Sequence, residues 1–260
     1  MEAQIFDGIK HAKKIEDLLS GKVREVSLQP VLVSILIGEN KGSELYVSLK
    51  QKFAERIGAK MIIQKFPEET SEQQIIDKIR DLNENANIDG IMIQLPVPST
   101  MDKDRLIEEI SSVKDVDGMK NDSSFICPVA LSVLEVIQSS GEKSTKVGIV
   151  GANGFIGKKI AATLSGYDIH KFDKGDVLDD LVKCDIVISA SGEPGLINSD
   201  LVKQGSLCID VGAPSAEFSK NVYEKAGFIT PVPGGIGPMT IAYLMYNLVE
   251  AAVAKAKKVC

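Results

Sequence analysis

The sequence predicts an α/β protein made of two units, each built around a parallel sheet. The first observation is that short β-branched apolar runs alternate with amphipathic stretches along most of the 260 residues. The second is that turn residues bound these runs, which is typical of buried strands joined by crossover helices. The third is that 44% of the residues are apolar and 25% are charged, which allows a large core and excludes wholesale disorder.

The first unit is predicted from the alternation of strand-length and helix-length patterns. Pro30 and Gly38 bound its first apolar run, which predicts a buried strand. Leu45 and Leu49 begin an i, i+4 series that continues to residue 57, so we expect both on the buried face of a helix. Ser71 is a candidate cap for the next helix. The expected elements are strands at 31–37, 60–66 and 88–95, and helices at 43–57 and from 70–72 to about 83.

The second unit follows the polar stretch 139–144. A helix at 125–140, with apolar residues at i, i+3, i+4 and i+7 spacing, is expected to connect the two units. The expected elements are strands at 146–150, 167–172, 185–190 and 207–211, helices at 155–164 and 177–183, and a last helix from about 237 to 257. We therefore assign 1–120, completed by 237–260, to the first domain, 141–232 to the second and 121–140 to the connection. Ligands of such sheets bind beyond the carboxyl ends of the strands, so the active site is expected in a cleft between the two units.

Composition excludes several classes of partner. The formal charge is −6, with no basic block and no tryptophan, which argues against nucleic acid. The polar N-terminus predicts no signal peptide, and the longest apolar runs are of strand length, so no membrane partner is expected. Four scattered cysteines and two histidines predict neither a disulfide framework nor a metal site, and they fit a reduced cytoplasmic setting.

Three glycines lie between a predicted strand and a predicted helix. Gly151, Gly154 and Gly157 give the spacing G-x-x-G-x-x-G. This spacing allows a tight turn, close approach of the backbone to a pyrophosphate, and close packing of helix on strand. The N-terminus of the helix offers oriented N–H groups to the phosphates. The pattern indicates NAD(P) binding in a Rossmann-type domain, with a tight structural turn as the alternative.

The strand after this helix leads to Asp173, 22 positions after Gly151. A carboxylate at that place can accept hydrogen bonds from the adenosine ribose and repel a 2′-phosphate, which favours NAD over NADP. The alternatives are that Asp173 is a solvated turn residue, or that Asp176 meets the ribose instead. Lys171 and Lys174 would offset part of the repulsion.

Candidate catalytic residues lie in the first unit. Ser43, Tyr46 and Lys50 share one helix face at i, i+3 and i+7. Burial favours the neutral form of a lysine, and a neutral amine can act as a general base. The alternative is a lysine that extends to solvent beside a boundary tyrosine.

Two further polar residues lie next to predicted turns. Gln94 ends a strand before two prolines and could orient a water or a ligand carbonyl, or simply end the strand. Asp117 precedes a glycine and could bind amidine-like nitrogens, or belong to an ordinary Asp-Gly turn. The dense Pro/Gly segment 231–240, just before a helix, is expected to pack on a ligand.

Taken together, these motifs resemble those of the methylenetetrahydrofolate dehydrogenase/cyclohydrolase family, and the resemblance covers most of the chain. The motifs also occur in the family's order. They are Ser43-x-x-Tyr46-x-x-x-Lys50, Asp89-Gly90-Ile-Met-Ile-Gln94-Leu-Pro96-Val-Pro98, Lys114-Asp-Val-Asp117-Gly118, Gly151 to Gly157 and Thr230 to Thr240.

The resemblance implies oxidation of 5,10-methylenetetrahydrofolate with NAD(P) and hydrolysis of the methenyl product to 10-formyltetrahydrofolate. It implies that Lys50 is the catalytic lysine of the hydrolysis and that Gln94 modulates it. It also implies that Tyr46 stacks near the folate and that Asp117 binds the pterin's amino-pyrimidine edge. The implied folate-binding residues are Ser43, Tyr46, Leu95, Pro96, Asp117, Pro233, Gly234, Gly235, Gly237 and Pro238. The implied cofactor-binding residues are Gly151, Ala152, Asn153, Gly154, Phe155, Ile156, Gly157, Asp173, Ala190, Ser191, Gly192, Gly212 and Thr240.

The chain departs from the family pattern where the cofactor would bind. Ala152-Asn153 replaces the usual Arg-Ser, and Lys171-Phe172-Asp173 replaces the usual His-Ser segment. Because the Arg and Ser groups commonly serve the NADP phosphate, these changes favour NAD. The family also implies a homodimer, and no metal is expected.

Other functions stay open at this point. The chain could be a monofunctional dehydrogenase or a monofunctional cyclohydrolase. The altered nucleotide loop also allows a nucleotide- or folate-binding protein with little turnover. A different NAD-dependent two-domain dehydrogenase is a further alternative, against which the segment Thr230–Thr240 argues.

Overall fold

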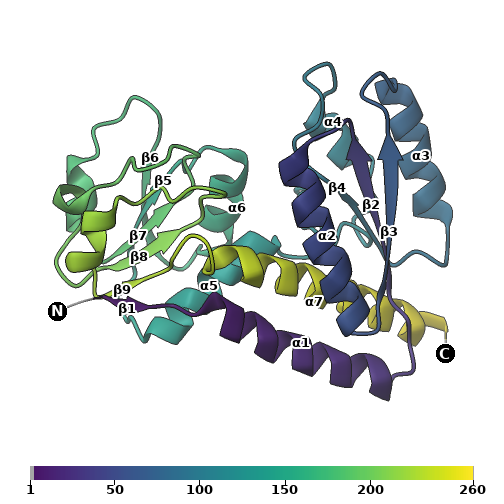
Figure 1. The fold of residues 1–260 in the computed structure, drawn as a ribbon, viewed down its shortest axis with the longest axis horizontal. Coiled ribbons are helices and arrows are strands. Elements are labelled where there is room, and N and C mark those ends of the chain that lie inside the picture. The colour runs from purple at the N-terminus through teal and green to yellow at the C-terminus, as the bar shows by residue number, and fades with distance from the viewer. Residues whose placement is uncertain (1–2, 260) are drawn as a thin grey trace. The chain divides into compact units, whose positions relative to one another are not determined.

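The computed structural model describes residues 3–259, which divide into two compact units (Figure 1). The first unit comprises the described residues up to Ala12 together with Val129–Thr240. The second comprises Lys13–Pro128 and the chain from Ile241 onward. The boundaries fall inside two helices, α1 (Gly8–Glu25) and α7 (Ile236–Val259), so each of these helices supplies residues to both units.

The first unit contains a six-stranded parallel sheet with the order β1-β9-β8-β7-β5-β6. The strand β5, next to the edge strand β6, pairs with β6 on one side and with β7 on the other. The order of the strands therefore reverses at β5, and ligands of doubly wound sheets bind at such a point. The strands are β1 (Gln4–Ile5), β5 (Lys146–Val150), β6 (Asp168–Phe172), β7 (Ile186–Ser189), β8 (Leu207–Asp210) and β9 (Phe228–Ile229).

Short helices connect these strands. The α-helices are α5 (Pro128–Ser140), which leads into β5, and α6 (Phe155–Thr163), which joins β5 to β6. Three 3-10 helices, at Asp179–Lys183, Ser199–Leu201 and Lys220–Glu224, make the remaining crossovers. One face of the sheet is packed around Leu181, Val187 and Cys208, all of which are fully buried.

The second unit contains a three-stranded parallel sheet with the order β3-β2-β4. Its middle strand β2 is buried along nearly its whole length, as its run of apolar residues, broken only by Ser34, predicts for a strand covered on both faces. The helix α3 begins with a capping box made by Ser71 and Gln74, which confirms the predicted cap. The elements are β2 (Val31–Ile37), α2 (Lys41–Arg56), β3 (Lys60–Phe66), α3 (Glu72–Glu84), β4 (Gly90–Ile93) and α4 (Lys103–Glu108), with the residues that α1 and α7 supply.

The units differ in their bounds from the assignment made on the sequence pattern. The N-terminal residues join the first unit because β1 pairs with β9, whereas we expected 1–120 to form one domain. Strands of two residues give no periodic signal, so β1 and β9 were not predicted. The helix α1 was also missed, although Ala12, Leu19 and Val23 lie buried along it.

The prediction for the buried face of α2 was right for Phe53 and Ile57, which are buried at its C-terminal end, and wrong for the two leucines. Leu45 and Leu49 are 60% and 42% exposed. Val47, Lys50 and Ala54 lie on the buried face instead. These three residues repeat at the spacing of the α-helix as regularly as the leucines do, so the pattern of leucines alone did not identify the face.

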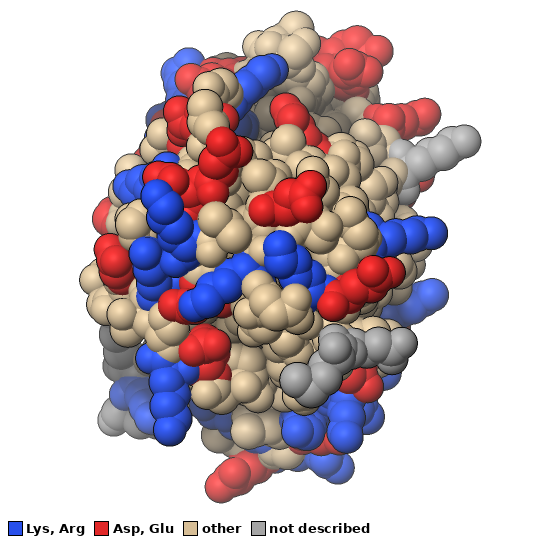
Figure 2. All heavy atoms as spheres, turned by 90° about the vertical axis from the view of Figure 1, so that its left-hand side faces the viewer, with Lys and Arg blue, Asp and Glu red and all other residues tan. Residues whose placement is uncertain are grey.

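The helix α7 is long and apolar enough to cross a membrane, which the short apolar runs of the sequence did not suggest. The relevant stretch is Ile236–Lys257, and 61% of its most apolar window is buried inside the structure. That burial is typical of a core helix in a folded protein. Over the face shown in Figure 2, basic and acidic side chains lie interspersed. Cys127, Cys184 and Cys208 are buried and form no disulfide among the described residues, and Cys260 lies outside those residues.

Candidate active site

A buried lysine contacts the carboxyl end of the sheet in the second unit. Lys50 on α2 is 8% exposed. Its Nζ donates a hydrogen bond to Gln94 Oε1 at 3.0 Å, and it lies 3.8 Å from Met92 Sδ. The structure thus brings together Lys50 and Gln94, 44 residues apart in sequence, as the family resemblance implies.

The segment after β4 is held against α2 by polar contacts. Gln94 uses its amide nitrogen to donate to the carbonyl of Leu95 at 2.9 Å. Ser43, which is buried near the start of α2, donates to the same carbonyl at 3.4 Å. Tyr46 is half-buried on α2, and Pro96 is exposed after a cis peptide bond. Both polar atoms of the Gln94 amide group therefore form hydrogen bonds, the nitrogen with Leu95 and the oxygen with Lys50.

Asp117 is the acidic group that interacts with Lys50. Burial raises the pKa of Asp117 to about 6, the charge of Lys50 opposes this rise, and the neighbouring Asp115 adds to it. Burial also lowers the pKa of Lys50, against the attraction of Asp117. Among the described residues, no side chain or backbone group forms a hydrogen bond or an ion pair with the Asp117 carboxyl group, so it is available to a ligand.

The turn that carries Asp117 is built from residues that are distant in sequence. Gly118 has φ +63, and a Cβ there would lie 2.5 Å from the Cys127 nitrogen, so only glycine fits. Asn247 on α7 is 3% exposed and donates to the carbonyls of Val116 and Ile126, at 2.8 and 2.9 Å. Asn247 therefore positions the Asp117 turn, and the sequence analysis missed it.

The electrostatics of this site suit proton transfer. A lysine with a lowered pKa holds more of its neutral form near neutral pH, and a neutral amine can accept a proton from water. Gln94 can orient that water or a ligand through its fixed amide group. The site can therefore catalyse attack of water on an electrophile that is already activated.

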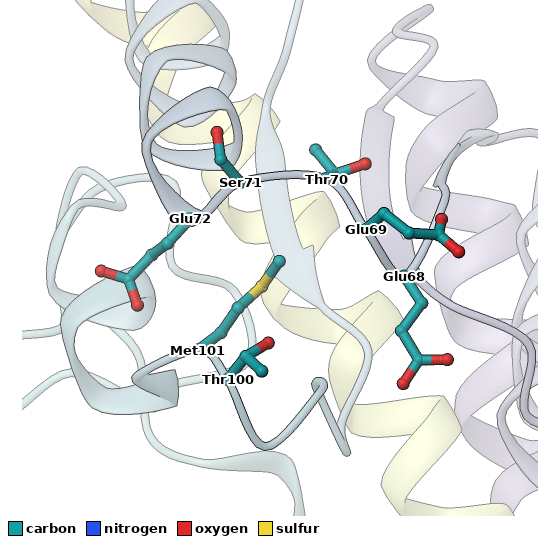
Figure 3. Close-up of a pocket in the computed structure, with 7 residues that line it drawn as sticks. All are labelled: Glu68, Glu69, Thr70, Ser71, Glu72, Thr100 and Met101. Atoms are coloured by element: carbon teal, nitrogen blue, oxygen red, sulfur yellow. The ribbon is translucent and has the colours of Figure 1, made fainter.

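A separate hollow in the second unit lies at the start of α3. Figure 3 shows Glu68, Glu69 and Glu72 around it, together with Met101 on the facing loop. Glu72 is already engaged, because it accepts hydrogen bonds from the Asp102 backbone and the Arg105 guanidinium. None of the predicted site residues lines this hollow.

In the first unit, the glycine loop follows β5 as predicted. Gly151 has φ +80, and a Cβ there would lie 2.4 Å from the Ala190 carbonyl oxygen. A Cβ at Gly157 would lie 2.0 Å from the Gly151 oxygen, so α6 packs directly on the turn. Gly154 caps α6 without a side-chain hydrogen bond, so phosphate oxygens can accept from N–H groups of the first turn. Ala152, Asn153, Phe155 and Ile156 lie between these glycines.

Asp173 lies beside the glycine loop. Its carboxylate oxygens are 3.0 and 3.2 Å from the Asn153 nitrogen, whose N–H they accept. Asp176 instead accepts the N–H of Asp173 at 2.8 Å and so closes the turn. Of the two rival acids, Asp173 is therefore the one that lies against the loop.

The other predicted cofactor residues occupy neighbouring loops of the first unit. Ala190, Ser191 and Gly192 follow β7, and Gly212 follows β8. The loop 230–235 packs on the start of α1, since a Cβ at Gly8 would lie 2.0 Å from the Gly235 oxygen. Residues 236–240, with Pro238 and Thr240, form the first turns of α7.

The fold and the two sites define a two-unit α/β protein in which one unit has the features of dinucleotide binding and the other carries a buried lysine. The family profile for the catalytic domain of tetrahydrofolate dehydrogenase/cyclohydrolase matches residues 6–117. The profile for the NAD(P)-binding domain of the same family matches residues 127–256. The chain therefore belongs to the tetrahydrofolate dehydrogenase/cyclohydrolase family.

Individual relatives match along almost the whole chain. The bifunctional protein FolD of Nautilia profundicola is 36% identical, over 98% of this chain and 99% of its own length. The solved FolD structure from Campylobacter jejuni has a TM-score of 0.91 at 30% identity, and covers 97% of this chain and 99% of its own. The Trypanosoma brucei enzyme, solved with NADP and an inhibitor, has a TM-score of 0.92 at 28% identity and covers 99% of both chains.

Proposed function

We infer that this chain oxidises 5,10-methylenetetrahydrofolate to 5,10-methenyltetrahydrofolate and hydrolyses the product to 10-formyltetrahydrofolate, with NAD as the preferred oxidant. The observation that carries the inference is the buried Lys50–Gln94 pair with Asp117 in electrostatic reach, in a chain whose two halves both match the family. The curated relatives along its full length are named as bifunctional proteins.

The hydrolysis uses the residues of the second unit. Methenyltetrahydrofolate is a cation whose positive charge is shared by two nitrogens around one carbon, so water can attack that carbon without a metal. Neutral Lys50 accepts a proton from the attacking water, and Gln94 holds the lysine and the water in place. The hydroxyl proton of the adduct then passes to N5, the bond from the carbon to N5 breaks as the formyl C=O forms, and the formyl group stays on N10. The net step consumes one water and releases one proton.

The oxidation uses the first unit to hold the dinucleotide. The geometry fits this ligand, because Gly151 makes the turn that only glycine allows and Gly154 leaves the helix N-terminus open to phosphate. When bound there, the nicotinamide would supply the acceptor for the hydride that the methylene carbon loses in becoming the methenyl cation. Among the described residues, no group of three or more His, Cys, Asp or Glu side chains could hold a metal ion.

The preference for NAD is supported by the carboxylate of Asp173. It lies against the glycine loop through the Asn153 N–H, where a ribose 2′-phosphate would meet its negative charge. The Arg and Ser that commonly serve that phosphate are replaced by Ala152 and Asn153. Lys174 is exposed in the next turn and weakens this preference without reversing it.

Asp117 is proposed to bind the amino-pyrimidine edge of the pterin. A carboxyl group that forms no hydrogen bond within the described residues can accept two N–H groups of that edge. Asp117→Ala is expected to weaken folate binding by about 2 kcal/mol, because the pterin donors lose their partner. Isothermal titration with the folate substrate tests this, and a loss below about 0.5 kcal/mol would reject the assignment.

The homodimer and the cytoplasmic location stay predictions. The first can be checked by sedimentation equilibrium, where a mass of one chain would contradict it. The second can be checked by fractionation of the source cells.

A further inference from the structure

A buried glutamate, Glu217, holds the segment that follows β7 in the first unit. Its Oε2 accepts hydrogen bonds from the Ser191 nitrogen at 2.8 Å, from the Ser191 hydroxyl at 2.7 Å, and from the Ser189 hydroxyl. Its Oε1 accepts the N–H of Gly192 at 2.8 Å. Four donors, one at the last residue of β7 and three just after it, thus converge on one carboxyl group, which belongs to a residue that is 2% exposed.

This segment lies against the glycine turn at the point where the strand order reverses. A Cβ at Gly151 would lie 2.4 Å from the Ala190 oxygen and 2.9 Å from the Ser191 Cα. There is no free space between the two loops, so a displacement of the segment after β7 would also displace the turn at Gly151. Whatever fixes Ala190 therefore also fixes the turn that would approach the pyrophosphate.

Glu217 is itself fixed by a second buried carboxyl group. Asp210 Oδ2 accepts the N–H groups of Glu217 and Phe218, at 2.9 and 3.1 Å. Asp210 Oδ1 accepts the N–H of Gly212 at 2.9 Å, and the Asp210 N–H donates to Thr230 Oγ1 at 2.7 Å. Burial and the charge of Glu217 both raise the pKa of Asp210, and the backbone hydrogen bonds oppose this.

Placing two buried carboxyl groups side by side costs stability. Neither forms an ion pair with a lysine, arginine or histidine among the described residues. Burying an acid without a cationic partner is unfavourable unless hydrogen bonds compensate, and here the bonds of Glu217 all go to one loop. The carboxyl group of Glu217 is thus fully used in holding Ser189, Ser191 and Gly192.

We propose that Glu217 is a positioning residue for the dinucleotide: it sets Ala190–Gly192 against the Gly151 turn so that the cofactor meets a preformed site. This inference rests on the proposed function, because it takes the ligand to be a nicotinamide dinucleotide. It also assigns the N–H groups of Ser191 and Gly192 to Glu217 and leaves phosphate binding to the glycine loop.

The test is Glu217→Gln, which keeps the size of the side chain but turns one acceptor oxygen into a donor. Facing four donors, the amide leaves at least one of them unpaired. We expect the dissociation constant for NAD, measured by isothermal titration, to rise about tenfold. Hydrogen exchange at Ser191 and Gly192 should become faster. Hydrolysis of methenyltetrahydrofolate, which uses Lys50 in the other unit, should persist and show that the variant folds.

Glu193→Gln is the matched control, because Glu193 is exposed in the same loop. It should leave both NAD affinity and exchange unchanged. If Glu217→Gln does not fold, Ser189→Ala and Ser191→Ala each remove one donor without changing charge. Each should raise the dissociation constant for NAD about threefold.

The possible outcomes separate the two proposals. Wild-type protein that binds NAD, together with a Glu217→Gln variant whose affinity lies within twofold of wild type, would overturn the positioning role and leave the proposed function intact. An unchanged affinity in both serine variants would do the same. Wild-type protein that binds neither NAD nor NADP would overturn both proposals.

Discussion

Replacing Asp117 with asparagine should make the protein more stable while it weakens substrate binding. The carboxyl group is kept in place by the fold, yet its ionised form is unfavourable there. Burial raises its pKa from 3.8 to about 6. An asparagine side chain is close to that of aspartate in size and carries no charge at any pH, so the substitution removes the cost of ionisation.

The magnitude follows from the change in pKa. Ionising a group whose pKa rises from 3.8 to about 6 on folding destabilises the folded state by up to about 3 kcal/mol. Asp117 keeps some contact with solvent, so we expect a gain of about 1–3 kcal/mol for Asp117→Asn above pH 6. The folded state binds the proton more tightly, so the cost grows as pH rises from 3.8 to about 6. The gain should therefore shrink on acidification and vanish near pH 3.8.

Hydrogen exchange at the slowest-exchanging backbone amides of β4 measures the stability of the second unit alone. Wild type and Asp117→Asn would be compared at about pH 7.5 and about pH 5, with rates corrected for intrinsic exchange. Asp122→Asn is the control, because Asp122 is exposed in the same segment and its pKa is lowered, chiefly by the Ser112 hydroxyl. That variant should show no gain. An Asp117→Asn variant no more stable than wild type at about pH 7.5 would refute the reasoning.

Three further substitutions test the two sites separately. Lys50→Met should reduce hydrolysis of methenyltetrahydrofolate by about a hundredfold or more, since it removes the only base assigned to that step, and a rate within threefold of wild type would reject this role. Asp173→Ser should bring kcat/KM for NAD and NADP closer together, and an unchanged ratio would count against contact with the ribose. Gly151→Ala places a Cβ 2.4 Å from the Ala190 oxygen and should weaken NAD binding more than tenfold in a titration, which is about 1.4 kcal/mol or more. Gly166→Ala is the control and should not weaken binding, because a Cβ there meets nothing within 4 Å. Equal NAD affinities of the two variants would show that the turn at Gly151 can relax.

Much of the fold follows from local pattern. The strands β2 and β5 were predicted to the residue, because buried parallel strands have a strong compositional signal. The glycine loop was also placed correctly, because the backbone of its tight turn requires glycines at a fixed spacing, and that spacing is visible in the sequence. The predicted buried leucines of α2 were wrong, because two faces of that helix repeat equally well and only the sheet decides between them.

The site could be predicted from the sequence only where its residues belong to a recognisable motif. Lys50 and Gln94 were found in this way, although the spacing around Lys50 alone does not distinguish it from a solvent-exposed lysine. Asn247 and Glu217 were missed, because each acts on residues that are distant in sequence or on a loop with no pattern of its own. The signal of Asn247 is a single polar residue inside an apolar stretch, which becomes informative only once its partners are known. Glu217 lies in a mixed segment between serines and gives no such signal.

The most direct test of the account is the initial rate with 5,10-methylenetetrahydrofolate, measured once with NAD and once with NADP. The methenyl product should be quantified separately from the reduced nicotinamide. We expect turnover with both, and a kcat/KM about tenfold or more higher with NAD, because we propose that the Asp173 carboxylate meets the adenosine ribose and repels a 2′-phosphate. Turnover mainly with NADP would support the proposed oxidation but contradict the proposed role of Asp173. No turnover with either, in protein that still hydrolyses methenyltetrahydrofolate, would contradict the bifunctional assignment.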